Sequence, residues 1–242
     1  MAKNETRQKI RFTVLLVTFL VLPVIFNYLS PYVILDGASQ GIIAGSAIVF
    51  FLMFLSSLYF GRFYCGWICP AAGMQEYCMN NINNRKIGSR RWFKWVIWIP
   101  WILMFVILLL TAQTLTVNFF HLTENFVSID EPMKWFTFYT VMLLIFGVTV
   151  YGGRRAFCHH VCWMAPFMII GTKIRNSLNL PGLRLKADKD KCTNCKKCNK
   201  VCSMSLDVNA MVQSEGFNNL DCVLCGSCVD NCPKKVIHYS FK

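Results

Sequence analysis

The thirteen cysteines of this chain are its most chemically informative residues, and eight of them form two copies of one pattern. The first copy has the spacing C-x2-C-x2-C-x3-C, and the second follows thirty positions later and precedes Pro233. This spacing is typical of chains that hold two [4Fe–4S] clusters, in which the fourth cysteine of each run ligates the other cluster. We therefore expect the first cluster to be held by Cys192, Cys195, Cys198 and Cys232, and the second by Cys222, Cys225, Cys228 and Cys202.

Zinc is the main alternative for these cysteines, because C-x2-C pairs also build zinc ribbons. A single zinc ion takes four ligands and gains nothing from a third regularly spaced cysteine, whereas three thiolates in one tight loop suit a cube. A segment of about fifty residues also buries too little apolar surface to fold alone. Cluster binding would then supply folding energy, as metals do in other small domains.

Four further cysteines form two shorter pairs. They are Cys65 and Cys69, in a C-x3-C-P motif, and Cys158 and Cys162, in a C-x3-C motif. Each pair follows an apolar run at the same distance, and alignment of the two pairs also matches Arg62 with Arg155. We interpret the first two thirds of the chain as two weakly similar copies of one unit.

Residues four apart share one face of a helix, so each pair can present two thiols together. Four sulfurs can hold a third iron–sulfur cluster or a metal ion, and a thiol switch or a docking surface is an alternative. Packing of small residues in a helical bundle is the structural alternative, and we assign Cys78 to that class. We expect His159 and His160 at the membrane surface, where contact with a quinone is a further alternative.

Hydrophobic residues make up 55% of the chain and concentrate in its first two thirds. Four runs are long enough for a membrane helix, which needs about 20 residues. These runs cover residues 12–35, 41–60, 95–115 and 135–151. We expect a membrane α-helical domain with four transmembrane helices over residues 1–162, an interfacial amphipathic linker over 163–187, and a small α+β domain with both clusters over 188–242.

Lysine and arginine cluster before the first run, between the second and third, and after the fourth. By the positive-inside rule, both termini and the cysteine-rich domain lie on the cytoplasmic side of the inner membrane. Attraction to anionic membrane lipid also accounts for the net charge of +13, so we expect no nucleic-acid partner.

Residues 186–242 resemble the bacterial dicluster ferredoxins, although Ser203 stands where a proline usually follows the first cysteine run. Nearly the whole chain resembles the NapH-type and NosR-type membrane ferredoxins, which join membrane C-x3-C-P motifs to a cytoplasmic dicluster ferredoxin domain. The first motif matches through Pro70, whereas Trp163 takes the place of the proline in the second. The resemblance implies low-potential, one-electron transfer within a larger redox pathway.

These observations favour a membrane-bound protein that passes single electrons between a cytoplasmic carrier, such as a ferredoxin or flavodoxin, and the quinone pool or a partner oxidoreductase subunit. Either direction of flow is allowed. A basic surface for an acidic carrier is formed by Lys186, Lys189, Lys191, Lys196, Lys197 and Lys200. No nucleophile motif, phosphate loop or nucleotide fingerprint indicates a stand-alone enzyme. The alternatives are a CcoG-like maturation or thiol-sensing protein and a structural anchor of a larger redox complex.

Overall fold

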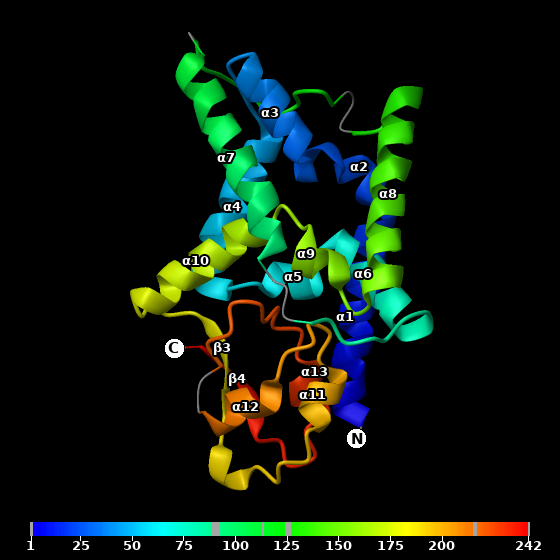
Figure 1. Ribbon diagram of the computed structural model, residues 1–242, viewed down its shortest axis with the longest axis vertical. Helices are drawn as coiled ribbons and strands as arrows, with labels where there is room; N and C mark the ends of the chain where they lie inside the picture. The colour runs from blue at the N-terminus through cyan, green and yellow to red at the C-terminus, as the bar shows by residue number, and fades with distance from the viewer. Residues whose placement is uncertain (1, 89–91, 113, 124–126, 215–216, 242) are drawn as a thin grey trace.

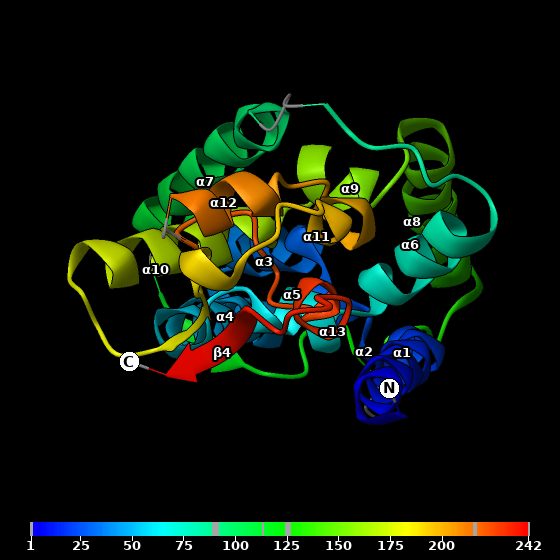
Figure 2. The ribbon, with the colours of Figure 1, turned by 90° about the horizontal axis from the view of Figure 1, so that it is seen from below.

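The computed structural model describes residues 2–88, 92–112, 114–123, 127–214 and 217–241. It consists of a helical part and a cysteine-rich part, which lie one above the other in Figure 1. The first helix, α1 (Ala2–Leu20), starts beside the cysteine-rich part and rises into the helical part. Viewed from below, the small helices of the cysteine-rich part lie across the centre of the helical part, with α1 at its edge (Figure 2).

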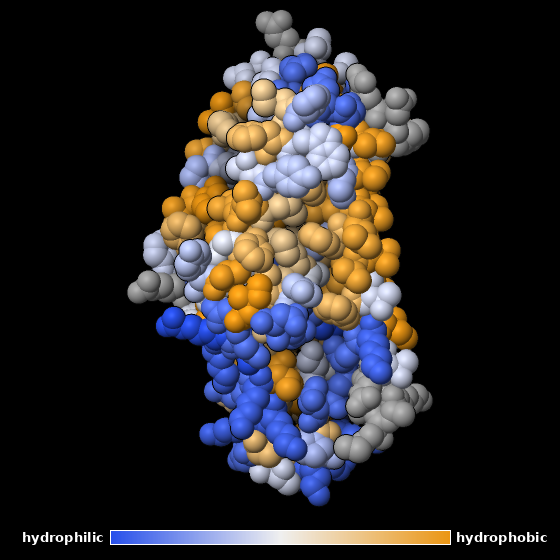
Figure 3. All heavy atoms as spheres, turned by 90° about the vertical axis from the view of Figure 1, so that its right-hand side faces the viewer, coloured by the Kyte–Doolittle hydropathy of each residue, from blue (hydrophilic) through white to orange (hydrophobic). Residues whose placement is uncertain are grey.

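Among the described residues, two helices are long and apolar enough to cross a membrane. They are α7 (Phe93–Thr111), which contains Pro100, and α8 (Pro132–Gly152), with mean hydropathies of 2.3 and 1.6. Many of their apolar side chains face outward, as at Leu110 and Leu143, which are 80% and 69% exposed. Figure 3 shows a hydrophobic band at this height of the molecule, between two hydrophilic ends. A patch of this extent is unusual on a protein that is surrounded by water.

The predicted run 12–35 does not form one continuous helix. After α1 it continues as α2 (Leu22–Ile25), the 3-10 helix η1 (Asn27–Leu29) and α3 (Pro31–Ser39). Pro23 and Pro31 lie in the first turns of α2 and α3. Proline has no backbone N–H and its ring clashes with the preceding turn, so it starts a helix readily but does not continue one.

The run 41–60 forms a short strand, β1 (Ile42–Ala44), and α4 (Gly45–Phe60). β1 pairs in parallel with β2 (Thr116–Asn118), which follows α7. With 16 residues, α4 is about 24 Å long, which is shorter than a typical bilayer core. Four continuous spanning helices are therefore not found among the described residues, because two of the predicted runs are broken or short.

The two halves of the helical part repeat the same order of elements. α4 is followed by the short helix α5 (Phe63–Trp67) and then α6 (Pro70–Asn81). In the same way, α8 is followed by α9 (Ala156–His160) and then α10 (Ala165–Ser177). The two C-x3-C motifs therefore occupy equivalent turns, each between a long apolar helix and a second helix.

The predicted linker, residues 163–187, divides into two structures. Its helix α10 packs against α4, with Met168 0% exposed and Ile169 5% exposed. The following strand β3 (Leu183–Ala187) pairs antiparallel with β4 (Ile237–Phe241) near the C-terminus. The sheet of the cysteine-rich part thus begins at Leu183, five residues before the expected boundary at 188, because its partner strand lies at the far end of the chain.

The cysteine-rich part adds four short helices to this two-stranded sheet. They are η2 (Lys189–Lys191), α11 (Lys197–Val201), α12 (Val208–Gln213) and α13 (Ser227–Asp230). Of these four helices, as far as the structure describes this part, α12 alone has a side-chain cap, in which the carboxylate of Asp207 accepts a hydrogen bond from the backbone N–H of Ala210. Helices this short are held by their surroundings rather than by their own propensity, so the cysteine loops depend on what binds between them.

Candidate iron–sulfur sites

The two cysteine sets expected from spacing line two separate hollows in the cysteine-rich part. The first is lined by Cys192, Cys195, Cys198 and Cys232, and the second by Cys202, Cys222, Cys225 and Cys228. Each hollow has a cavity volume of about 20 Å³. The near-equal volumes and the exchange of the fourth cysteine between the runs are what two equivalent cluster sites require.

The two cysteine loops also repeat the same backbone turns. Asn194 and Lys196 in the first loop have φ values of 55° and 54°, and the equivalent Leu224 and Gly226 in the second have 52° and 77°. This left-handed conformation costs Leu224 about 1–2 kcal/mol, so the loop around it is held by other interactions. Turns of this kind aim successive backbone N–H groups at one point and bind anions. The loops therefore suit thiolate-bound clusters.

The two hollows differ in their surroundings. Cys195 of the first set is exposed, whereas Cys202, Cys225 and Cys228 of the second set are buried. The backbone N–H of Leu206 lies 3.4 Å from the sulfur of Cys202, and the hydroxyl of Ser203 donates to the sulfur of Cys225 at 3.7 Å. The first hollow thus faces solvent, and the second faces the helical part.

A third group of thiols lies where the helical and cysteine-rich parts meet. Its members, Cys65, Cys69, Cys158 and Cys162, are at most 5% exposed. Burial, together with the nearby Cys158 and Cys65, raises the pKa of Cys162 to about 12. Ionised thiols here would need positive charge close to them, because burial and mutual repulsion both oppose the thiolate form.

Two arginines supply positive charge to this group from repeat-equivalent positions. Arg62 and Arg155 are 1% and 0% exposed. Within the described part of the chain, Nε and Nη2 of Arg62 and Nε of Arg155 have no hydrogen-bond partner. Asp221 and Glu76 each bind one nitrogen of these guanidinium groups, but the unmatched N–H groups are still costly to bury without a further acceptor. The residues present therefore fit an iron–sulfur cluster with four thiolates, which carries net negative charge, at these cysteines.

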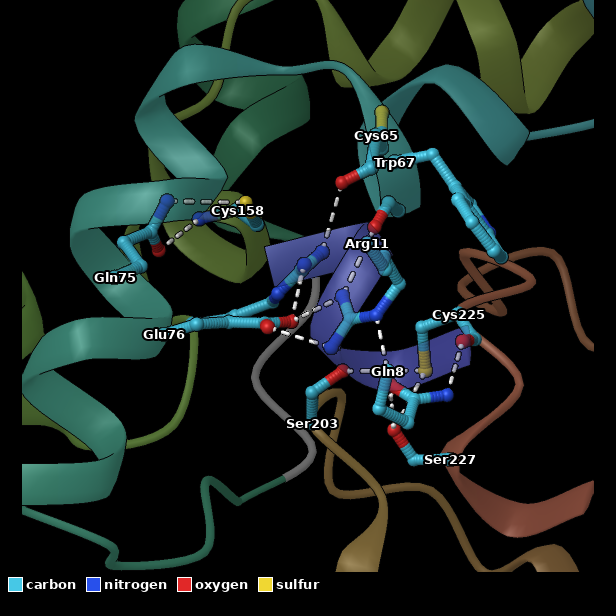
Figure 4. Close-up of polar contacts among 12 residues, drawn as sticks. Gln8, Arg11, Cys65, Trp67, Gln75, Glu76, Cys158, Ser203, Cys225 and Ser227 are labelled. Atoms are coloured by element: carbon cyan, nitrogen blue, oxygen red, sulfur yellow. Dashed lines mark hydrogen bonds and ion pairs between the residues drawn. The ribbon is translucent and has the colours of Figure 1, made fainter. Parts of the chain in front are cut away.

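The backbone of the first C-x3-C motif packs directly against the loop of the second cysteine set. A Cβ atom on Gly66 would lie 2.1 Å from the carbonyl oxygen of Val223 and 3.4 Å from the backbone N of Cys225. The indole N–H of Trp67 donates to the carbonyl oxygen of Leu224 at 3.1 Å. Figure 4 shows Trp67 next to Cys65, with Cys225 below them. The second cysteine set is therefore the one next to the four buried thiols.

A buried ion network holds this junction together. The carboxylate of Glu76 accepts hydrogen bonds from Arg11 at 2.6 and 2.9 Å and from Arg155 at 2.5 Å (Figure 4). Arg11 also donates to the carbonyl oxygen of Gly66, and Arg155 to that of Cys65. Glu76 is 2% exposed, so its charge depends on the two arginines.

Ion pairs also connect the two parts directly. Arg7 on α1 pairs with Asp230 on α13, and Gln8 donates to the carbonyl oxygen of Cys225 at 3.1 Å. Arg62 and Lys94 both bind the carboxylate of Asp221, at 3.2 and 2.8 Å. Basic residues that were expected to mark the cytoplasmic side, such as Arg7 and Arg62, therefore also hold the cysteine-rich part in place.

The remaining candidates lie outside the group of four thiols. Cys78 is buried on α6, where it was expected to be structural. His159 is buried, and its Nε2 lies 3.0 Å from the carbonyl oxygen of Met204 in the cysteine-rich part. Sequence reasoning missed Gln75 and Met168, although each stands six residues after the second cysteine of a C-x3-C motif.

An apolar pocket of about 270 Å³ opens beside the two C-x3-C motifs. Pro70 and Ala71, which follow Cys69, line it together with Trp163 and Met164, which follow Cys162. The broken segment α2–η1–α3 and one face of α8 form its other walls. Its few polar groups include Asn27, Ser30, Lys134 and Thr137. The pocket can take a flat apolar ligand with a small number of polar atoms.

Comparison with protein families defines the class of the protein. A model described as a 4Fe-4S binding domain matches residues 42–90 and 135–181, and one described as a 4Fe-4S dicluster domain matches residues 191–237. Each segment matched by the first model contains one C-x3-C pair at the same distance from its start, in agreement with the internal repeat. The chain is an iron–sulfur protein with [4Fe–4S] binding domains.

Three curated relatives narrow this class. The ferredoxin-type protein NapH of Haemophilus influenzae and the methylamine utilization ferredoxin-type protein MauN of Paracoccus denitrificans are each 28% identical over 82% of this chain. YccM of Escherichia coli, which is named for electron transport, is 22% identical over 84% of the chain. The matches cover 68%, 68% and 57% of these relatives' own lengths. No solved structure matches the chain. Over most of its length the chain is therefore similar to the NapH-type 4Fe–4S ferredoxins.

Proposed function

We propose that this protein conducts single electrons between a cytoplasmic carrier and the membrane through three cysteine sites in series. The observation that carries the proposal is the contact of Gly66 with the backbone of Val223 and Cys225, which joins the second ferredoxin site to the four buried thiols. When bound, a [4Fe–4S] cluster supplies one-electron transfer. The chain's own contribution is to hold the sites close, exclude water and neutralise their charge.

The proposed ligands follow the expected sets. Cys192, Cys195, Cys198 and Cys232 hold the outer cluster, and Cys202, Cys222, Cys225 and Cys228 hold the middle one. Cys65, Cys69, Cys158 and Cys162 hold a third cluster at the membrane side, with Arg62 and Arg155 as its counter-charges. Exposure of Cys195 makes the outer site the point of exchange with a soluble carrier. Lys196 and Lys197 beside it favour an acidic carrier, such as a ferredoxin or flavodoxin.

The membrane end of the path lies at the apolar pocket. In the proposed topology, α1–α3, α4, α7 and α8 give four crossings of the inner membrane, with both termini and the ferredoxin part in the cytoplasm. The pocket is then lined by side chains of α8 and by Pro70 and Trp163, the residues that directly follow Cys69 and Cys162. A quinone fits this position, because its ring is flat and apolar and carries two polar oxygens. A membrane oxidoreductase subunit that covers the same opening is the alternative acceptor.

Burial of the four thiols separates this proposal from the role of a thiol sensor or metal chaperone. Reactive cysteines are partly exposed and have a lowered pKa, whereas these are at most 5% exposed and burial raises the pKa of Cys69, Cys158 and Cys162. The site is therefore suited to a permanently bound group rather than to exchange with solution.

Quinone reactivity tests the proposed membrane end of the path. The protein is reconstituted in lipid vesicles, reduced with dithionite and mixed with a short-chain quinone, and cluster absorbance is followed. We expect reoxidation on a catalytic timescale, and we expect the Val141→Trp variant, which fills the pocket, to slow it at least tenfold. Leu143→Trp on the same helix faces outward and serves as the control. The quinone proposal is contradicted if the wild type is not reoxidised, or if Val141→Trp and Leu143→Trp are reoxidised at equal rates.

Iron content tests the third cluster. Three cubes require about twelve irons per chain and two require about eight. We expect about twelve in the wild type and about eight in Cys158→Ala, because that change removes one ligand of the membrane site only. Cys78→Ala is the matched control and should keep the wild-type content. A wild type with about eight irons would falsify the assignment of a cluster to the four buried thiols.

A further inference from the structure

Two side chains at repeat-equivalent positions touch the buried thiols crosswise. Gln75 stands six residues after Cys69, and its Nε2 lies 3.2 Å from the sulfur of Cys158 in the other motif. Met168 stands six residues after Cys162, and its sulfur lies 3.3 Å from that of Cys65. Both side chains are 0% exposed. Each half of the repeat therefore covers the first cysteine of the opposite half.

The orientation of the Gln75 amide is determined by its other contacts. Its Oε1 accepts the backbone N–H of Cys158 at 3.3 Å, and its Nε2 donates to the carbonyl oxygen of Ala71 at 3.1 Å. A backbone N–H can only donate and a carbonyl can only accept. Nitrogen and oxygen therefore cannot be exchanged, and the group that faces the Cys158 sulfur is an N–H donor (Figure 4).

Met168 offers the opposite chemistry to Cys65. A thioether has lone pairs and no proton to donate, so it can only accept from a thiol. Once Cys65 is a thiolate, its sulfur receives no hydrogen bond from this side chain. The site thus has one sulfur with an amide donor and one sulfur with an apolar, polarizable neighbour.

We propose that Gln75 and Met168 set the reduction potential of the membrane cysteine site in opposite directions. This inference rests on the proposed cluster at Cys65, Cys69, Cys158 and Cys162. Reduction adds an electron that spreads onto the thiolate sulfurs, and a donor to sulfur stabilises that added charge. Gln75 therefore raises the potential of the site, and Met168 keeps it lower than a second donor would. Both act on the potential through the ligand sulfurs.

Exchange of the two residue types tests this inference, because Gln and Met are unbranched and of similar length. Gln75→Met removes the donor, and Met168→Gln provides one for Cys65. We expect Gln75→Met to lower the equilibrium constant for reduction of this site about tenfold, which is about 59 mV for a one-electron couple. Met168→Gln should raise the equilibrium constant for reduction by a similar factor. The double exchange should return the potential of the site close to the wild-type value. Gln40→Met, at an exposed site that bonds Asp36, is the control.

The measurement is a potentiometric titration followed by EPR, with iron content determined on each sample. Opposite shifts in the two variants, at wild-type iron content, support the inference. Equal potentials at wild-type iron content overturn it and leave the conduit proposal intact. A wild type without a third EPR signal and with about eight irons overturns the third cluster and this inference together. If Gln75→Met loses iron, the inference is tested on the Met168→Gln variant alone. An unchanged reduction potential of the membrane site in that variant also overturns the inference.

Discussion

Replacement of Glu76 by leucine is expected to destabilise the protein by about 3–5 kcal/mol, the cost of removing one partner of a buried ion group. Glu76 is the shared acceptor of Arg11 and Arg155, and all three side chains are buried. Its loss leaves two guanidinium groups close together in a region with little water. Burial raises the pKa of this carboxyl, but Arg155 and Arg11 lower it further, so Glu76 is ionised and its removal changes the local charge.

Denaturant unfolding in mixed micelles, followed by tryptophan fluorescence, measures this loss. Glu76→Gln keeps the shape and part of the hydrogen bonding and should lie between wild type and Glu76→Leu. Glu131→Leu is the matched control, because Glu131 is exposed and precedes α8 without a capping hydrogen bond. A loss below about 1 kcal/mol in Glu76→Leu, equal to that of the control, would show that the network does not hold the junction.

Replacement of Gly66 by valine is expected to slow electron transfer strongly and to reduce the stability of the protein less. The nearest atom to a Cβ at this position is the backbone oxygen of Val223, at 2.1 Å, with its carbonyl carbon at 3.2 Å. A backbone group cannot rotate away as a flexible side chain can, so the two loops must separate. Overpacking of this kind typically costs about 1–3 kcal/mol.

Separation of the loops lengthens the gap between the second cysteine set and the buried thiols. We expect Gly66→Val to keep its full iron content and the potentials of its clusters, but to lose most of its quinone-dependent reoxidation. Gly147→Ala is the control, because a Cβ there meets no atom within 4 Å and alanine favours the interior of α8 by about 1 kcal/mol. Wild-type reoxidation in Gly66→Val would show that electrons do not cross at this contact.

The local features of the sites were accessible from the sequence because each depends on a few neighbouring residues. Three cysteines in one loop define the spacing of a cluster motif, so both runs were predictable from neighbouring residues. The crossing of Cys202 and Cys232 is not local and was expected only from the general pattern of chains with two such runs. The same holds for the apolar helices α7 and α8. The shared helix face expected for each C-x3-C pair is not formed, because α5 and α9 end before Cys69 and Cys162.

The tertiary structure decided the features that depend on partners far apart in the chain. Arg7 and Asp230 pair across nearly the whole sequence, Gln75 meets a sulfur in the other half of the repeat, and β3 pairs with the C-terminal strand. No local pattern specifies which of two equivalent cysteine loops turns toward Gly66, because the two runs have the same spacing. The sequence by itself thus predicted the two cysteine sets that line the two hollows. Packing and buried charge decided that the second set lies next to the buried thiols, since these interactions form only when the whole chain is folded.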